Sequence, residues 1–401
     1  MDKKYYFLIL ALCFVVLLFR YSDRSKSRQC SDFHVTYETA KRFAAKEDIY
    51  TKFDDPTIAN FKYSPFFAFL TAPLALFSLY QAGIILFVIN FFSLVLIFVF
   101  CQILIVHEPL SPRDRFLLFV LPLIFTFRYI LGILDAGQIN MMMIAFVVMA
   151  LYFVERRKEG VAGAFMALSV MFKYTPFVFI PYLIIQKRWK TVLSTLIFMF
   201  AFCLVPIIYV GFVREAHYIQ EWFPFLAKTS LDQGSLCDFK NQSFYSFILR
   251  YFTTGQYFCG KIALAHFTYR QGLILAAVFS ILIYLLVLLP VSNSNLRGKR
   301  FIDYALLFVC IPIFNANAWT FNYAALIFPY MLIFYYFLKN KRKDKVVLLL
   351  TVFSFILGSG GSRELAGTKG QEWSQALSLT TIGALLVMGA LFRLKFGREN
   401  I

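Results

Sequence analysis

Charged side chains are scarce in this sequence, and their scarcity excludes an ordinary soluble domain. Asp, Glu, Lys and Arg make up 15% of the 401 residues, whereas a soluble globular protein averages about 25%. Hydrophobic residues account for 60%, and several apolar runs reach roughly the 20 residues that cross the hydrocarbon core of a bilayer. These runs are continuous and do not alternate with polar residues, which argues against a membrane-spanning barrel. We therefore expect an all-α protein that crosses the membrane many times.

Several signatures of other protein classes are also missing. No small-x-small cleavage site follows the first apolar run, residues 5–19, so we interpret it as an uncleaved first span. The sequence contains neither an internal repeat nor a linker, and residues 1–401 are expected to form a single integral membrane domain. The seven Cys lack the spacing of a zinc site. Cys237 and Cys259 lie in one predicted loop and are the pair that an oxidising compartment would allow to form a disulfide.

Acidic residues are fewer than basic ones, 22 against 40, which leaves a formal net charge of +18. In a soluble protein this excess would suggest a nucleic-acid partner. Here the basic residues concentrate in short loops between apolar runs, such as 156–158, 187–190 and 297–300, as the positive-inside rule describes for cytoplasmic loops. The orientation of the protein in the membrane thus explains the excess of basic residues, and no nucleic-acid partner is expected. The same rule predicts that both termini are cytoplasmic.

The apolar runs and basic loops together predict a bundle of roughly twelve transmembrane helices in a cell membrane. Two large outer loops, residues 21–81 and 214–265, are expected to connect some of them. The short run 65–78 is interpreted as an interfacial or re-entrant helix, because counting it as a span would place the Arg156 loop outside. The expected spans are 5–19, 82–106, 116–134, 141–154, 161–172, 177–185, 192–213, 266–290, 302–314, 321–338, 346–357 and 376–392.

The first outer loop contains a predicted amphipathic helix. Asp32 stands where a helix N-cap is expected, and Phe33, Tyr37, Ala40 and Ala44 follow it on one helical face. Such a helix should lie on the membrane surface rather than cross the bilayer.

Uncommon polar residues gather at the expected outer ends of the spans, whereas the inner ends carry orientation charge. Polar groups at membrane depth are energetically costly, and they usually face a cavity. The asymmetry therefore predicts a water-filled site that opens to the outside. The residues concerned are Asp32, Lys62, Tyr63, Asp135, Gln138, Asn140, Lys173, Asn241, Gln242, Asn315, Asn317 and Trp319.

Each of these residues also has a structural interpretation. Asp32 would cap a helix, Gln138 would bond across helices at a helix boundary, and Lys173 would extend its ammonium towards the lipid headgroups. Asn241-Gln242-Ser243 is also a glycosylation sequon, which matters only in a eukaryotic secretory compartment. Their order and common side, rather than any single residue, indicate a shared site.

Six short motifs contain most of these residues: Asp32-Phe33-x-x-x-Tyr37, Tyr63-Ser64-Pro65-Phe66, Gly137-Gln138-x-Asn140, Lys173-Tyr174-Thr175-Pro176, Asn241-Gln242-Ser243 and Asn317-Ala318-Trp319. In these motifs the sequence resembles glycosyltransferase family 87 of the GT-C superfamily, from about Asp32 to Trp319. The family's Ser-Pro-x-Ser-Trp-x-His pattern appears as residues 315–321, Asn-Ala-Asn-Ala-Trp-Thr-Phe, which keeps Trp319 and lacks the His. A GT-C-like character of the helical bundle is implied by this resemblance.

The resemblance implies a membrane glycosyltransferase that moves a sugar from a polyprenyl-phosphate carrier to a glycan or glycolipid acceptor. Mannose is the best-known donor sugar of the family, and the resemblance implies a reaction at the outer face of the cytoplasmic membrane. Asp32 matches by position the family's catalytic acid in the first outer loop. The implied partners are the lipid-linked donor, the acceptor and membrane lipids.

The residue types suit an inverting transfer, in which one carboxylate takes a proton from the acceptor hydroxyl while the lipid phosphate leaves. Asp32 is the expected general base, and Asp135 is the alternative carboxylate. No cofactor is required, because basic residues can neutralise the phosphate; the lack of an Asp-x-Asp motif fits this, and a divalent metal is not indicated. Asp135 is also among the expected substrate-binding residues. The other expected substrate contacts are Lys173, Arg250 and Lys62 to the phosphate, Gln138, Asn140, Asn241 and Gln242 to sugar hydroxyls, and Tyr63 and Trp319 to a sugar ring.

A transporter or flippase for a lipid-linked sugar is the alternative, since such proteins also combine many spans with intramembrane polar groups. Inverted repeats and paired broken helices are typical of transporters and are not evident in this sequence, whereas large outer loops suit an enzyme. A ligase that moves a whole lipid-linked glycan fits as a third interpretation. The sequence leaves the donor sugar, the acceptor and the carrier length open.

Overall fold

The computed structural model of the chain describes residues 3–26, 31–55, 58–230, 232–254, 264–289, 297–340 and 344–397. The secondary structure of these ranges is helical, apart from an isolated bridge between Thr253 and Phe267. The expected all-α class is therefore confirmed for the part of the chain that the structure describes.

Six of the described helices are long and apolar enough to cross a membrane. A seventh crossing results if the pair Lys345–Ser359 and Arg363–Ala376, bent by 82°, is counted as one broken span. Four further apolar helices are only 10–17 residues long. The total of about twelve crossings, and the interfacial position of the helices in the first loop, therefore stay predictions. The six helices are Leu79–Ile105, Pro112–Ala136, Trp189–Val210, Tyr269–Leu288, Thr320–Lys339 and Leu379–Phe396.

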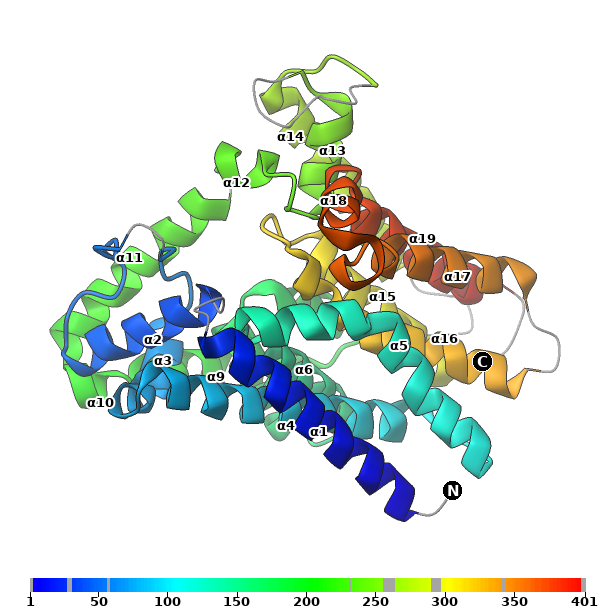
Figure 1. Cartoon of the computed structure of the whole chain (residues 1–401), viewed down its shortest axis with the longest axis horizontal. Helices are drawn as coiled ribbons and strands as arrows, with labels where there is room; N and C mark the ends of the chain where they lie inside the picture. The colour runs from blue at the N-terminus through cyan, green and yellow to red at the C-terminus, as the bar shows by residue number, and fades with distance from the viewer. Residues whose placement is uncertain are drawn as a thin grey trace. The chain divides into compact units, whose positions relative to one another are not determined.

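The chain forms two compact units, and the first comprises residues 1–100 and 131–228. Figure 1 shows α2 beside α3 in this unit, and both α3 and the 3-10 helix η1 contact α2. The complete bounds of its helices, of which α4, α5 and α11 extend beyond the unit, are α1 (Lys3–Lys26), α2 (Ser31–Ala44), α3 (Pro65–Thr71), η1 (Ala72–Leu76), α4 (Leu79–Ile105), α5 (Pro112–Ala136), α6 (Asn140–Glu155), α7 (Glu159–Phe172), η2 (Thr175–Val178), α8 (Phe179–Ile185), α9 (Trp189–Leu204), α10 (Ile207–Val210) and α11 (Phe212–Ser230).

A polar contact joins α7 to α9 in the first unit. Glu159 accepts a hydrogen bond from Arg188 at 3.0 Å and another from Thr191 at 2.5 Å. Ser194 donates to the backbone oxygen of Gly160 at 2.9 Å. Two short apolar helices are thereby held together at one end by an ion pair and along one side by small residues.

The second unit comprises residues 101–130 and 229–401. In it α17 and α19 lie against each other closely, since a Cβ added to Gly383 would stand 2.9 Å from the backbone oxygen of Ser354. Asp344 caps α17 and pairs with Arg393 of α19 at 2.7 Å. The helices of this unit besides α5 are α12 (Gln233–Cys237), α13 (Phe244–Phe252), α14 (Tyr269–Leu288), α15 (Arg297–Ile313), η3 (Thr320–Leu326), α16 (Ile327–Lys339), α17 (Lys345–Ser359), α18 (Arg363–Ala376) and α19 (Leu379–Phe396).

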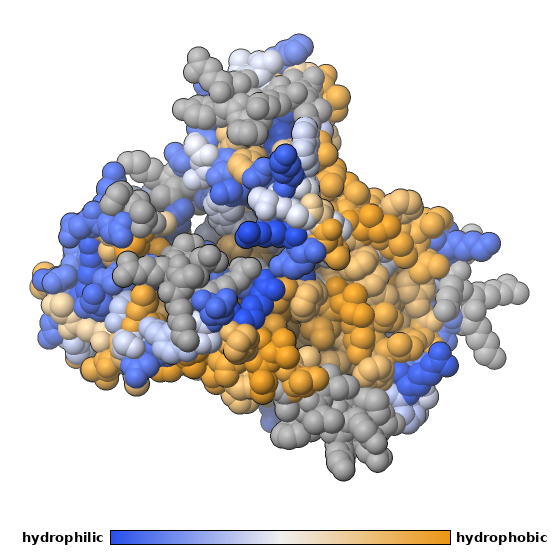
Figure 2. All heavy atoms as spheres, in the orientation of Figure 1, coloured by the Kyte–Doolittle hydropathy of each residue, from blue (hydrophilic) through white to orange (hydrophobic). Residues whose placement is uncertain are grey.

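Large apolar side chains are exposed on the helices of both units. Phe92 on α4, Phe200 on α9, Leu285 on α14 and Leu349 on α17 each expose more than half of their surface. Figure 2 shows broad hydrophobic areas of surface, with hydrophilic residues gathered in separate patches. Contact with water would make such areas unfavourable, whereas contact with lipid does not. The surface is that of a multi-pass membrane protein.

The second expected outer loop contains helices. Residues 214–265 hold most of α11 as well as α12 and α13. Within residues 214–265, α13 spans Phe244–Phe252 and begins directly after Ser243, which caps it. Cys237 is disulfide-bonded, and its expected partner Cys259 lies outside the described residues.

Candidate active site

Asp32 lies in the first turn of α2. The helix begins at Ser31, so the expectation that Asp32 occupies the N-cap is wrong. Its carboxylate is directed at another helix end instead, where Oδ2 accepts a hydrogen bond of 2.5 Å from Nε2 of Gln138. Oδ1 accepts no hydrogen bond from any residue that the structure describes. One carboxylate oxygen is thus held, and the other is available to a ligand.

The surroundings of Asp32 make it a stronger base than an ordinary aspartate. Burial raises the pKa of its carboxyl above the usual 3.8. The hydrogen bond from Gln138 and the positive charges of Lys173 and Lys62 act in the opposite direction and offset part of this increase. A carboxylate with a raised pKa accepts a proton more readily near neutral pH, which is what general-base catalysis requires.

The C-terminus of α5 presents Gln138. Gly137 has a φ of +67°, its N–H donates to the carbonyl of Leu134, and the N–H of Gln138 donates to the carbonyl of Ile133. These two bonds form a Schellman motif, in which glycine is favoured because it adopts a positive φ without steric cost. A Cβ at position 137 would also lie 2.5 Å from Cβ of Phe33. The turn therefore brings Gln138 directly beside the first turn of α2.

Asn90 is a buried polar residue of this site that our sequence reasoning missed. It lies within the long apolar helix α4, exposes 1% of its surface, and donates from Nδ2 to the backbone oxygen of Gln138 at 2.9 Å. A lone amide in an apolar run of this length is costly unless it is bonded. That cost was the signal in the sequence that pointed to Asn90.

Tyr63 contacts the other end of the Gln138 amide. Its hydroxyl donates to Oε1 of Gln138 at 3.3 Å, and its ring packs against Phe67 with a centroid separation of 5.0 Å. Ser64 caps α3 and donates to the backbone oxygen of Met171 at 2.6 Å. The Tyr-Ser-Pro corner is thus fixed to the end of α7, and the Tyr63 hydroxyl is fixed with it.

Lys173 follows the last residue of α7 and donates to Oδ1 of Asn140 at 3.0 Å. Burial lowers the pKa of its ammonium to about 8, an effect that the negative charge of Asp32 opposes and the positive charge of Lys62 reinforces. An ammonium that is bonded to a side-chain amide within the protein favours a place in the candidate site over an extension towards the headgroups. Lys173 is thus bonded to Asn140, and its charge interacts with that of Asp32, so the three residues belong to one site.

The backbone at Lys62 and Tyr63 is held from two sides. Tyr50 donates from its hydroxyl to the carbonyl of Tyr63 at 2.9 Å, and Trp222 of α11 donates to the carbonyl of Lys62 at 3.4 Å. Both supporting residues escaped our sequence reasoning, because nothing local marks them.

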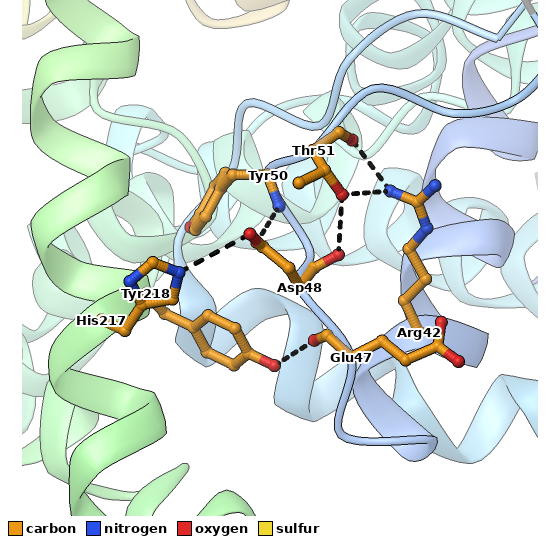
Figure 3. A network of polar contacts seen from close by, with 7 residues as sticks. All are labelled: Arg42, Glu47, Asp48, Tyr50, Thr51, His217 and Tyr218. Atoms are coloured by element: carbon orange, nitrogen blue, oxygen red, sulfur yellow. Dashed lines mark hydrogen bonds and ion pairs between the residues drawn. The ribbon is translucent and has the colours of Figure 1, made fainter.

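Helix α11 is itself attached to the segment that follows α2, as Figure 3 shows. The Asp48 carboxylate accepts from the backbone N–H of Tyr50 at 3.0 Å and lies 3.6 Å from Nε2 of His217. The Tyr218 hydroxyl donates to the carbonyl of Glu47, and Arg42 donates to Thr51. This network fixes the segment that carries Tyr50 and thereby supports the Tyr63 corner.

Asp135, the alternative carboxylate, is engaged elsewhere. Arg20 of α1 donates to both of its oxygens, from Nε at 3.2 Å and from an Nη at 2.8 Å. A bidentate arginine pair of this kind occupies both carboxylate oxygens. Asp135 therefore ties α1 to the end of α5, while Asp32 keeps one oxygen available.

The remaining predicted site residues lie in the second unit, where most of them bond to the backbone. Asn241 donates to the carbonyls of Ser235 and Ala316, both at 2.9 Å, and Gln242 donates to that of Gln375 at 2.9 Å. Such contacts hold connecting segments together, because buried backbone carbonyls require a partner. Trp319 is half-buried and directly precedes η3.

Arg250 exposes 3% of its surface, and burial lowers the pKa of its guanidinium to about 10. It donates to the Ser378 hydroxyl and to four backbone carbonyls, those of Asp238, Phe239, Asn241 and Gln375. This set of acceptors favours a structural role in the second unit over a contact with a phosphate.

Across the described ranges, no group of three or more His, Cys, Asp and Glu side chains is arranged to hold a metal ion. Among known proteins, the sequence model of Glycosyltransferase family 87 matches residues 61–312, which is more than half of the chain. No curated protein matches the sequence. The matched region contains Tyr63, Gln138, Asn140 and Lys173, and it begins after Asp32.

Proposed function

We propose, from the fact that this chain belongs to glycosyltransferase family 87, that it transfers a hexose from a polyprenyl-phosphate carrier to a glycan or glycolipid acceptor. Mannose is the expected sugar, and the outer face of the cytoplasmic membrane is the expected place of reaction. The observation that carries this proposal is the state of Asp32, whose Oδ2 is held by Gln138 while Oδ1 is available. A base needs a fixed orientation and one accessible oxygen, and Asp32 has both.

In the proposed reaction, the acceptor hydroxyl gives its proton to Oδ1 of Asp32 as its oxygen attacks the anomeric carbon of the donor sugar. The bond between that carbon and the phosphate oxygen breaks, and the phosphate leaves with the electron pair. A single displacement of this kind inverts the configuration at the anomeric carbon and needs no second carboxylate. The raised pKa of Asp32 favours the proton transfer.

The leaving phosphate acquires negative charge, which nearby cations stabilise. Lys173 and Lys62 supply positive charge in the neighbourhood of Asp32, since both lower the pKa of its carboxyl against the effect of burial. We assign the phosphate contact to these two residues rather than to Arg250, which bonds to backbone carbonyls. Asn140, which is bonded to Lys173, is the proposed contact for a sugar hydroxyl.

The test is sugar transfer in proteoliposomes that contain the full-length protein and defined, labelled polyprenyl-phosphate sugars. We expect transfer from one of these donors, and we expect Asp32→Asn to reduce turnover by roughly two to four orders of magnitude, the usual contribution of a positioned acid–base group.

Asp135→Asn is the matched control, since it changes the other carboxylate that the sequence offered. It should leave substantial transfer, because both Asp135 oxygens are bonded to Arg20. Full activity of Asp32→Asn together with loss of transfer in Asp135→Asn would show that the base is assigned to the wrong residue.

A further inference from the structure

We propose that Gln138 is a positioning residue, whose amide holds one oxygen of the Asp32 carboxylate and is itself oriented by the Tyr63 hydroxyl. The inference rests on the proposed role of Asp32 as general base, and it replaces the expectation that Gln138 binds a sugar hydroxyl. The observations that carry it are the bond of 2.5 Å from Gln138 Nε2 to Asp32 Oδ2 and the bond of 3.3 Å from the Tyr63 hydroxyl to Gln138 Oε1.

The two hydrogen bonds from Tyr63 to Gln138 and from Gln138 to Asp32 form a relay, and the chemistry of the three groups determines which group donates in each bond. An ionised carboxylate can only accept hydrogen bonds, so Gln138 must turn its NH2 group towards Asp32. Its carbonyl oxygen then faces Tyr63, which must donate its proton. Burial and the negative charge of Asp32 both raise the pKa of the Tyr63 hydroxyl above its usual value, so that the hydroxyl keeps this proton at neutral pH. The relay therefore supports the ionised form of Asp32.

The backbone of Gln138 is fixed independently of its side chain. Asn90 donates to the carbonyl of Gln138 at 2.9 Å, and the N–H of Gln138 closes the turn at the end of α5. Gly137 lies so close to Phe33 that the end of α5 and the first turn of α2 cannot approach further. The amide thus holds the carboxylate from a rigid support, which is the condition for a well-oriented base.

A positioning role has a consequence that a sugar contact lacks. Because the Gln138 bond lowers the pKa of Asp32 against the effect of burial, its removal should raise that pKa further. The other charged groups that act on Asp32, Lys173 and Lys62, remain in place in such a variant. A residue that only binds a sugar hydroxyl would change the Michaelis constant for the donor and leave the titration of Asp32 as it is.

The experiment measures the titration of Asp32 directly in the full-length protein in nanodiscs. A water-soluble carbodiimide with an amine nucleophile modifies protonated carboxyl groups, and peptide mass spectrometry reports the pH midpoint of labelling at Asp32. We expect Gln138→Leu to raise this midpoint by about one pH unit, a tenfold change in proton binding. Tyr63→Phe should raise it by less, because the amide stays present but loses the bond that orients it.

Gln186→Leu is the matched control, since Gln186 is an exposed glutamine at the end of α8 and should leave the midpoint unchanged. In the transfer assay, the acidic limb of kcat/KM should move to higher pH in Gln138→Leu, in step with the labelling midpoint. An unchanged midpoint in both Gln138→Leu and Tyr63→Phe would overturn the proposal, as would a raised Michaelis constant with an unmoved acidic limb. If the wild-type protein transferred none of the sugars, the proposed function would fail while the labelling result still decided the role of Gln138.

Discussion

Asp32 is a residue whose surroundings favour chemistry over stability. Burial raises the pKa of its carboxyl in the folded protein, so the folded state binds the proton more tightly than the unfolded state does. Below the usual pKa of 3.8 both states are protonated and the group contributes nothing. As the pH rises from there through the raised pKa, stability falls, and the full penalty remains at neutral pH.

We therefore expect Asp32→Asn to be at least as thermally stable as the wild-type protein at pH 7, although it loses turnover. Its advantage should shrink as the pH is lowered towards about 4, where the wild-type carboxyl becomes protonated as well. Melting temperatures of both proteins in nanodiscs at the two pH values would measure this. A variant that melts clearly below the wild type at pH 7 would mean that the ionised carboxylate stabilises the fold.

Lys173 should make kcat/KM for the donor decline at basic pH. Burial lowers the pKa of its ammonium to about 8, so the positive charge that we propose it offers to the phosphate is present below that pH and is lost as the pH rises through it. We expect kcat/KM for the donor to fall above about pH 8, because this ratio reports the free enzyme.

Lys173→Arg should move this decline to higher pH, since a guanidinium stays charged. Lys173→Gln should lose donor binding at every pH while its melting temperature changes less. The assignment fails if the wild-type ratio is flat across the interval from about pH 7 to 9, or if Lys173→Gln binds the donor as well as the wild type does.

At the scale of elements, the end of α5 and the start of α2 meet at Gly137. Any side chain there would be strained, because the φ of +67° lies in the left-handed region and the added Cβ would stand 2.5 Å from Phe33. The backbone strain alone costs about 1–2 kcal/mol, and displacement of Phe33 would shift Asp32. Gly137→Ala should therefore lower both the melting temperature and the transfer rate.

Gly160→Ala provides the comparison for this prediction. Gly160 lies in α7, and no atom would come within 4 Å of an added Cβ. Alanine is the better helix former by up to about 1 kcal/mol, so this variant should keep its activity and its stability. Equal effects of the two substitutions would show that the contact with Phe33 does not position Asp32.

Helix α11 carries a buried acid in its first turn. Glu215 exposes 1% of its surface, and neither of its carboxylate oxygens has a hydrogen-bond partner among the described residues. Burial raises the pKa of this carboxyl to about 8, against 4.5 in the unfolded chain. Between these two values the unfolded state releases its proton first, so stability falls as the pH rises from about 4.5 to 8.

Glu215→Met keeps the length of the side chain and removes the titration. The melting temperature of the wild type should drop more between pH 5 and 9 than that of the variant, and Glu221→Met, at an exposed position of the same helix, should behave as the wild type does. Parallel curves for the wild type and Glu215→Met would show that the carboxyl does not stay protonated in the folded protein.

At the scale of the whole molecule, the distribution of charge predicts the orientation. Basic residues of the short loops, such as Arg156, Lys187 and Lys299, should lie in the cytoplasm, and Gln138 and Trp319 should lie outside. Single Cys residues at these positions, in a Cys-free background, can be labelled with a membrane-impermeant thiol reagent from either side. Labelling of position 138 from the cytoplasm alone would place the candidate active site on the wrong face.

The sequence by itself determined the class of protein and the local structure that depends on neighbouring residues. Long apolar runs predict membrane helices because burying their backbone in lipid requires internal hydrogen bonds. Ser243 caps α13 through its own hydroxyl, and Gly137 ends α5 through its own backbone, so both helix boundaries depend on residues at the boundary itself. The family was recognisable for the same reason, since its motifs are short and local.

Only the tertiary structure decided which polar residues meet. The bond between Gln138 and Asp32 joins residues 106 positions apart, and Arg20 reaches Asp135 across 115 positions. Such pairings depend on how helices pack, which no local pattern encodes. From the sequence, we accordingly expected both Arg250 and Lys173 to contact the phosphate. Packing placed Arg250 among backbone carbonyls and Lys173 within electrostatic reach of Asp32, because each charge in a buried environment must find compensation from whatever its neighbours in space provide.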